Sequence, residues 1–323
     1  MGRIDARTNE YMSDKTHFAD VFNFFLYGGR DVIKPDRLSE MDTAALALPF
    51  GKDAKPSDMI QRIRDVFKGL AAMGDGNAVY VLLGIENQSF IHYAISVKNM
   101  LYDAVQYAKQ VDEAAKSHRE YAKNHPGKAY STSDEFLSGF HKDDRLTPVI
   151  TLVILWSPEK WDGPRSIHEM LAIKDEEIIK YVPDYKINLV APSEISDSDF
   201  SKFHTVLGKA LQFIKHSNDT DKLEEMVEND QSFKNLDRRT VELINETTNS
   251  NIEIPKGAKE VNLCIAIEGM KRKAAEEAAE KAVNETIIND IKNLMDSMKW
   301  TAEQAMEALK ITADNRKKLI RML

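Results

Sequence analysis

Three residues around an apolar segment, Asp65, Glu86 and Gln88, carry side chains that could bind a metal ion and orient a water molecule. Glu86 and Gln88 follow residues 78–83, which have the length and composition of a buried strand. Side chains alternate along a strand, so we expect Glu86 and Gln88 on the same face. A carboxylate that ends a buried strand needs a partner to offset its desolvation, and a bound cation is such a partner.

A turn signal lies between the two acids. Residues 74–77 are Gly-Asp-Gly-Asn, a sequence typical of a tight turn. We therefore expect a hairpin of residues 65–73 and 78–88 that brings the carboxylates of Asp65 and Glu86 together. Two such carboxylates form an oxygen-rich site suited to Mg²⁺, or to Mn²⁺ or Ca²⁺.

This arrangement resembles the active site of the PD-(D/E)XK nuclease superfamily, with Asp65 as the first acid, Glu86 as the second and Gln88 at the Lys position. More narrowly, the chain is similar to the Rpn family of recombination-promoting nucleases and transposases. The matching stretches are residues 18–23, 84–89, 99–104 and 146–153. The similarity covers roughly the first two thirds of the chain and includes the order of these stretches.

The resemblance implies a divalent-metal-dependent endodeoxyribonuclease linked to recombination or mobile elements. In such an enzyme Asp65 and Glu86 hold the metal and Gln88 helps to orient the attacking water. A Lys at position 88 would add a positive charge beside the scissile phosphate, which the neutral amide does not supply. Lys68, on the first arm of the hairpin, or Lys98, at the start of the next helix, could supply that charge. The sequence does not choose between them.

Two further residues are candidates for supporting roles. Asp20 falls on a predicted helix near the N-terminus, where related nucleases often add an acidic residue. The alternative is that Asp20 is an exposed acid on the polar face of that helix. Gln106 falls on the helix after the site, which in nucleases of this type lends polar side chains to the active centre.

The remaining segments predict a mixed α/β core, a PD-(D/E)XK-like sheet flanked by helices. Strands are expected at residues 65–73, 78–88 and 149–155, with shorter candidates at 91–94 and 187–190, because these segments combine strand length with apolar content. The apolar spacing of residues 18–27 predicts a helix ended by Gly28, and a longer helix is expected over residues 96–116. The polar segment 118–144 is expected to be a loop or an insertion.

We expect a nuclease-like domain over residues 1–220 and a helical region over residues 221–323. Residues 263–298 are low in helix breakers and are expected to form one long helix. Thr301 and Gln304 have the spacing of a capping box, which predicts the start of another helix.

The helical region has two interpretations. Ile288, Ile291, Met295 and Met298 form an apolar stripe on the long helix, which favours a homodimer through C-terminal helices. The short helices joined by residues 310–312 could instead be a helix-turn-helix reader of DNA. Packing or oligomerisation is the alternative for these short helices.

Other chemistries have weaker signals. The eight histidines, His118 and His141 among them, show no ligand spacing such as i, i+4 on one helix, and we expect them to be non-catalytic. Cys264 lies in an apolar helical segment and is expected in the core. The glycines at 74 and 76 do not form a phosphate-binding loop.

Composition limits the partners. The net charge of −8 argues mildly against a general nucleic-acid coat, although metal ligands are themselves acidic. No apolar run approaches the ~20 residues needed to cross a bilayer. Residues 1–10 lack the apolar region of a signal peptide, and the single cysteine excludes an intrachain disulfide. We therefore expect a cytoplasmic protein with no membrane partner.

Two functions are open at this point. The first is a metal-dependent DNA endonuclease. The second is a catalytically inactive nuclease-fold protein that binds nucleic acid or a protein partner, which both Gln88 and the acidic net charge allow. Metal-dependent nicking of a plasmid, absent in an Asp65→Ala variant, would distinguish the two.

Overall fold

The computed structural model describes residues 3–40, 71–74, 79–127, 129–312, 316 and 320. Asp65, Lys68 and the rest of residues 65–70, the first part of the expected hairpin, lie outside the described residues. The chain divides into two compact units, Met1–Val261 and Asn262–Leu323. Residues 221–261, which we expected to belong to the C-terminal region, are part of the first unit.

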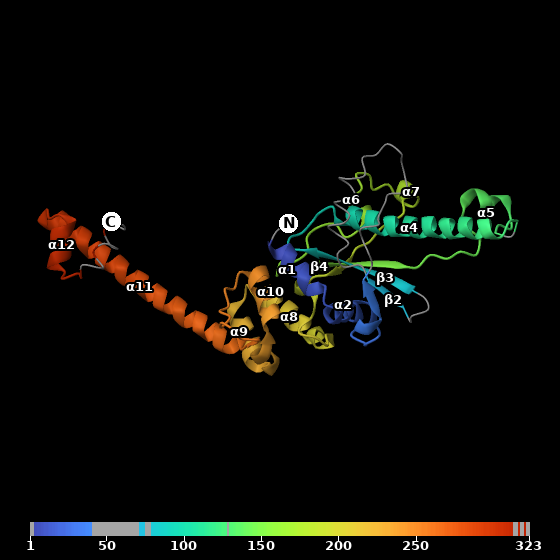
Figure 1. Cartoon of the computed structure of the whole chain (residues 1–323). Coiled ribbons are helices and arrows are strands. Elements are labelled where there is room, and N and C mark those ends of the chain that lie inside the picture. Colours follow the sequence, from blue (N-terminus) through green and yellow to red (C-terminus); the bar gives the residue numbers. More distant parts are fainter. Residues whose placement is uncertain are drawn as a thin grey trace. The chain divides into compact units, whose positions relative to one another are not determined.

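Within the described residues, the first unit is built on a five-stranded mixed sheet with the order β1-β2-β3-β4-β5 (Figure 1). The strands are β1 (Leu38–Glu40), β2 (Ala71–Gly74), β3 (Val79–Gln88), β4 (Val149–Leu155) and β5 (Asn188–Val190). The first three strands pair antiparallel, and β4 pairs in parallel with both β3 and β5. The expected α/β core and the strands at 78–88, 149–155 and 187–190 are thus confirmed.

The adjacent strands β3 and β4 carry the core of the sheet. Every residue of β4 is buried except Ile150, which is half-buried. Burial on both faces is typical of parallel strands covered by helices. Glu86 pairs with Val153 and Gln88 with Leu155. The polar end of β3 therefore lies beside a fully apolar part of β4.

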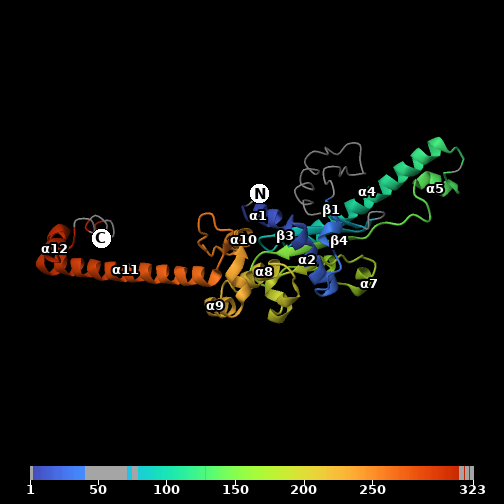
Figure 2. The ribbon, with the colours of Figure 1, turned by 60° about the horizontal axis from the view of Figure 1, so that its bottom comes forward.

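Helices cover both faces of this sheet. In Figures 1 and 2, α4 lies on one side of the strands and α2 and α8 on the other. The helices of the first unit include α1 (Arg3–Met12), α2 (Lys15–Tyr27), α4 (Ile95–Asn124), α8 (Leu207–His216) and α10 (Arg238–Thr248). As expected, α2 ends at Gly28, whose φ of 61° suits glycine at a helix C-terminus. Because β3 and β4 are parallel, a crossover must join them, and α4 provides it.

Shorter elements complete the first unit. The helices are α5 (Ser133–Ser138), α6 (Ile167–Met170), α7 (Glu176–Ile179) and α9 (Thr220–Asn229). The 3₁₀ segments are Pro35–Arg37, Pro192–Glu194, Asp197–Lys202 and Gln231–Asn235. The strands β6 (Leu236–Asp237) and β7 (Glu260–Val261) form a separate antiparallel pair.

Two local predictions were wrong. Residues 91–94 do not form a strand: residues 93–94 are a turn, and Ile91 packs against a core cluster that contains Ile95 and Trp161 instead of pairing with the sheet. The helix expected at 96–116 continues as α4 to Asn124 and enters the segment expected to be a loop. Residues 117–124 contain neither Pro nor Gly, so the first helix breakers are Pro126 and Gly127.

The second unit consists, in its described part, of α11 (Leu263–Met298) and α12 (Ala302–Ala308). The long helix matches its prediction, and both hydrogen bonds of the Thr301–Gln304 capping box are present. Ile288 and Ile291 pack against Ala305 and Met306 of α12, with other apolar residues around them. Part of the stripe expected to drive dimerisation therefore packs within the chain. None of the helices in the described residues is long and apolar enough to cross a membrane.

Candidate functional site

Glu86, Gln88 and Lys98 meet at the end of β3. Glu86 and Gln88 are both 6% exposed, and they share a face of the strand as the alternation predicts. Gln88 Nε2 donates a hydrogen bond to Glu86 Oε1 at 2.6 Å, and Lys98 Nζ donates to the same oxygen at 2.5 Å. Of the two lysines left open by the sequence, Lys98 thus reaches the site, and Lys68 lies outside the described residues.

The second carboxylate oxygen of Glu86, unlike the first, accepts no hydrogen bond from the described residues. Glu86 Oε2 is buried and has no hydrogen-bond partner in the described structure. Ser96 and Asn99, which lie one turn apart on the buried face of α4, also carry unpartnered polar atoms: Ser96 Oγ, and Asn99 Oδ1 and Nδ2. A buried polar group without a partner costs about 1–3 kcal/mol, so such atoms mark places where a ligand can supply the missing bond.

A cleft of about 290 Å³ opens beside Glu86. Its walls come from the end of β3, the start of α4 and the helix α1; the lining residues are Asp5, Asn9, Ile85, Glu86, Asn87, Gln88, Ser89, Phe90, His92 and Lys98. Two hydrogen bonds fasten α1 to this wall, from Asn87 Nδ2 to Asn9 Oδ1 at 2.9 Å and from Ser89 Oγ to Asp5 Oδ1 at 3.1 Å. The cleft therefore has carboxylates on two sides.

The electrostatics of the cleft suit a cation. Burial raises the pKa of Glu86, while the Lys98 amine and the Gln88 amide act in the opposite direction. The carboxylate of Asp5 raises the pKa of Glu86 a little further. Burial and the charge of Glu86 also raise the pKa of the Tyr102 hydroxyl. The lysine offsets part of the cost of a buried carboxylate, and a divalent cation would offset more of it.

Asp20 and Gln106 have other surroundings. The Asp20 carboxylate is buried and accepts hydrogen bonds from the backbone N–H groups of His204 and Thr205, both at 2.9 Å, and from Thr205 Oγ1 at 2.6 Å. These contacts anchor the chain just before α8, which explains Asp20 structurally. Gln106 is buried on α4 and is not among the residues that line the cleft.

The acid that α1 contributes to the cleft is Asp5, which was not among the residues predicted for the site. Its position in the first turn of an N-terminal helix was a weak signal, and only the packing of α1 against β3 brings it to Glu86.

A second group of polar side chains was also missed. His118, from α4, lies with His141 and Asp144 from the loop after α5, and their ligand atoms are all within 4.8 Å of one another. The histidines were expected to be non-catalytic because no two share a metal-binding spacing. That criterion examines one helix at a time and does not detect partners from separate elements.

The cleft thus combines a buried carboxylate, a second acid, an amide and an amine. Such a set can bind a hard divalent cation through its carboxylates and an anionic group through its amine. No family model, curated protein or solved structure matches the chain.

Proposed function

We propose that the protein is a divalent-metal-dependent endonuclease that cleaves DNA, as its resemblance to the PD-(D/E)XK superfamily implies. One observation carries the proposal: the buried carboxylate of Glu86 has one oxygen bonded to Gln88 and Lys98, while its other oxygen has no partner among the described residues. A purely structural Glu86–Lys98 ion pair would not need a second acid and a cleft beside it.

The donor set fits Mg²⁺ or Mn²⁺. Glu86 Oε2 is the ligand atom that the geometry offers, and Asp5 is a further acid of the cleft. The resemblance implies that Asp65 is also a metal ligand. Carboxylate oxygens are the ligands that these hard cations prefer. When bound, the cation would activate water and neutralise charge on the scissile phosphate.

In this proposal, Lys98 and Gln88 together replace the lysine of the superfamily: Lys98 supplies the positive charge, and Gln88 orients the Glu86 carboxylate. The Lys98 amine lies in the cleft at the end of a strand–turn–helix connection and supplies the positive charge that Gln88 lacks. The Gln88 amide holds Oε1 of Glu86 and so orients its other oxygen. The Lys98 contact depends on α4 beginning soon after β3, which keeps the amine within reach of Glu86, whereas the Gln88 contact lies within β3 itself.

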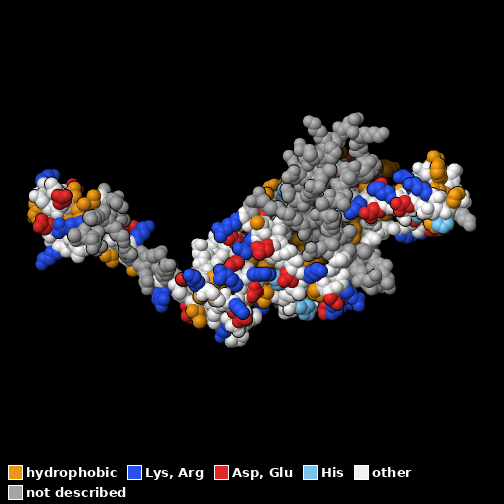
Figure 3. Space-filling view, in the orientation of Figure 1, with side chains coloured by type: hydrophobic (Ala, Val, Ile, Leu, Met, Phe, Trp, Pro, Cys, Tyr) orange, Lys and Arg blue, Asp and Glu red, His pale blue; other side chains and the backbone are white. Residues whose placement is uncertain are grey.

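DNA as the substrate follows from the resemblance. On the face in Figure 3, Lys and Arg side chains are interspersed with Asp and Glu along the described part of the first unit. This pattern favours local contacts with phosphates near the cleft over a broad basic binding surface.

Nicking of a supercoiled plasmid tests the proposal. With Mg²⁺ or Mn²⁺ we expect relaxed circles from the wild-type chain, and a loss of about 10²–10³-fold in rate for Glu86→Gln. Glu113→Gln is the matched control, because Glu113 also pairs with a lysine of α4 but is exposed. Equal nicking by wild type and Glu86→Gln, or no nicking with any divalent ion, would refute the proposal. The second outcome, together with retained DNA binding, would favour the inactive nuclease-fold protein.

A further inference from the structure

The second half of α4 and the segment that returns from α5 form an arm of the first unit, residues 115–127 and 129–144 (Figures 1 and 2). The returning chain approaches the helix closely at Gly139, where a Cβ atom would be 3.0 Å from the Cβ of Ala115. Gly139 also ends α5 with a φ of 70°, so both its conformation and its packing favour glycine. This approach brings residues 140–144 beside the next turn of α4, which carries His118.

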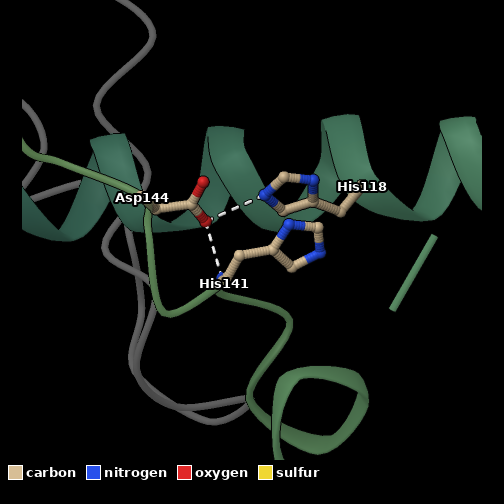
Figure 4. A group of neighbouring side chains, drawn as sticks. All are labelled: His118, His141 and Asp144. Atoms are coloured by element: carbon tan, nitrogen blue, oxygen red, sulfur yellow. Dashed lines mark hydrogen bonds and ion pairs between the residues drawn. The ribbon is translucent and has the colours of Figure 1, made fainter. Parts of the chain in front are cut away.

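Three potential metal ligands meet there. Figure 4 shows the side chains of His118, His141 and Asp144 pointing toward one another. His118 Nε2 is 2.8 Å from Asp144 Oδ2, which also accepts the backbone N–H of His141 at 2.7 Å. The two imidazole rings stack with centroids 3.6 Å apart. The carboxylate is thus held at the edge of a histidine pair.

Hydrogen bonding inside the cluster leaves one ring nitrogen unsatisfied. His141 Nε2 is buried and has no partner in the described structure. The ring of Tyr130 packs edge-on against the His141 ring, with centroids 5.5 Å apart, and helps to bury it. A structural His–Asp pair accounts for the contact of His118 with Asp144, but it does not account for a second histidine with a buried, unpartnered nitrogen.

We propose that His118, His141 and Asp144 bind a transition-metal ion of the Zn²⁺ class. Two imidazoles and one carboxylate form a ligand set of catalytic and other open zinc sites, in which water takes the fourth position. Mg²⁺ and Ca²⁺ prefer oxygen ligands, so this set selects Zn²⁺, Co²⁺ or Ni²⁺ over them. The ion would replace the hydrogen bond between His118 and Asp144, and the nitrogen of the His141 ring that lies nearer Asp144 in Figure 4 would be its third ligand.

Such an ion cross-links the two segments of the arm. It joins α4, through His118, to the loop that follows α5, through His141 and Asp144. Phe136 and Leu137 on α5 are 66% and 80% exposed, and hydrophobic side chains are visible at the end of the arm in Figure 3. Metal binding therefore fixes the position of a short helix that presents apolar side chains to solvent.

The visible absorption of Co²⁺ and calorimetric titration with Zn²⁺ test the site. The full-length chain with Glu86→Ala serves as background, because this change disables the cleft as a competing site. We expect about one Zn²⁺ per chain at micromolar concentrations and an absorption band typical of four-coordinate Co²⁺. His118→Ala and His141→Ala should each weaken binding by more than about tenfold.

His125→Ala is the matched control. His125 lies just past the end of the same helix and stacks on Tyr121, but it is not part of the cluster. The control should bind Zn²⁺ as the background chain does. Absence of binding, or equal binding by the His118→Ala, His141→Ala and His125→Ala chains, would overturn the proposal.

Limited proteolysis provides a second readout that does not depend on binding data. Chymotrypsin can cleave after the exposed Phe136 and Leu137. Zn²⁺ should slow this cleavage several-fold in the background and His125→Ala chains, and not in His141→Ala. If Zn²⁺ leaves the cleavage rate unchanged in all three chains, the ion does not cross-link the arm.

Discussion

The cleft at Glu86 and the cluster on the arm have the same local design but different ligand atoms. In both regions two donors converge on one carboxylate oxygen, Oε1 of Glu86 and Oδ2 of Asp144. Both also keep a buried atom without a partner, which is an oxygen of Glu86 in the cleft and a nitrogen of His141 on the arm.

Under the two proposals, this difference would decide which ion each region binds. Oxygen ligands favour Mg²⁺ or Mn²⁺, and imidazole nitrogens favour Zn²⁺ or Co²⁺. The two regions also differ in how they are assembled. The cleft takes its main residues from one strand and the start of the next helix, whereas the arm cluster joins a helix to a loop more than twenty residues later. Similar hydrogen-bond patterns around one carboxylate oxygen thus accompany different sets of potential ligand atoms in the two regions.

The largest expected effect is that mutations in one region abolish its own property, plasmid nicking or Co²⁺ binding, and leave the property of the other region unchanged. Glu86→Ala should lower plasmid nicking by about 10²–10³-fold and leave Co²⁺ binding on the arm unchanged. His118→Ala should have the opposite pattern, with nicking within about twofold of wild type. Nicking rates and Co²⁺ spectra on the same preparations check this. Parallel loss of both properties in either variant would show that the regions act as one site.

Removal of the Lys98 amine should have the next largest effect. Lys98→Met leaves the buried Glu86 carboxylate without its cation and should lower the unfolding free energy by about 1–3 kcal/mol at pH 7. The same change should lower nicking by about 10–100-fold if Lys98 supplies the missing charge. Urea denaturation and nicking assays measure the two effects. Lys109→Met, which breaks the more exposed pair with Glu113, is the control and should change neither property appreciably.

Two acids near the N-terminus should give contrasting results. Asp20→Asn should lower the unfolding free energy by about 1–2 kcal/mol, because the carboxylate accepts three hydrogen bonds before α8. Asp5→Asn should lower nicking by about tenfold with a smaller loss of stability, because Asp5 lines the cleft. Thermal melts and nicking rates distinguish the roles. If Asp20→Asn reduces nicking more than Asp5→Asn does in folded protein, Asp20 is the acid that supports the site.

A smaller effect is expected in the pH dependence of stability. Burial raises the pKa of Glu86 in the folded protein above its ordinary value. The folded state therefore binds a proton more tightly than the unfolded state, and this contribution is present in acid and is lost as pH rises through the folded-state pKa. Without metal, the unfolding free energy of Glu86→Gln should match that of wild type in acid and exceed it at pH 7. Denaturation in EDTA from pH 4 to pH 7 measures the difference, and a stability gap that widens toward acid would contradict the sign.

The smallest effect on nicking is expected from removal of the second unit. A chain that ends at Val261 keeps the sheet, the cleft and the arm, so nicking should stay within about twofold of the full chain. Light scattering on both chains tests the expected homodimer, because the truncated chain should then be a monomer and the full chain a dimer. Equal mass states would exclude dimerisation through the C-terminal helices.

Local patterns in the sequence determined most of the elements. The apolar runs at 78–83 and 149–155 predicted β3 and β4 because strand formation follows length and β-branched content. The sequence also predicted the capping box at Thr301 and the end of α2 at Gly28, because helix caps depend on residues within one helical turn. The shared face of Glu86 and Gln88 followed from the alternation of a single strand.

Only the tertiary structure decided which distant side chains meet. It brought Lys98 to Glu86 and Asp5 to the cleft, and it paired the Asp20 carboxylate with the backbone just before α8. It also gathered the histidine cluster on the arm and packed part of the apolar stripe of α11 against α12. The physical reason is that periodicity and caps reflect interactions between near neighbours in the chain, whereas a site depends on how separate elements pack. A single sequence encodes that packing through many weak contacts spread over the whole core, and no local pattern reports it.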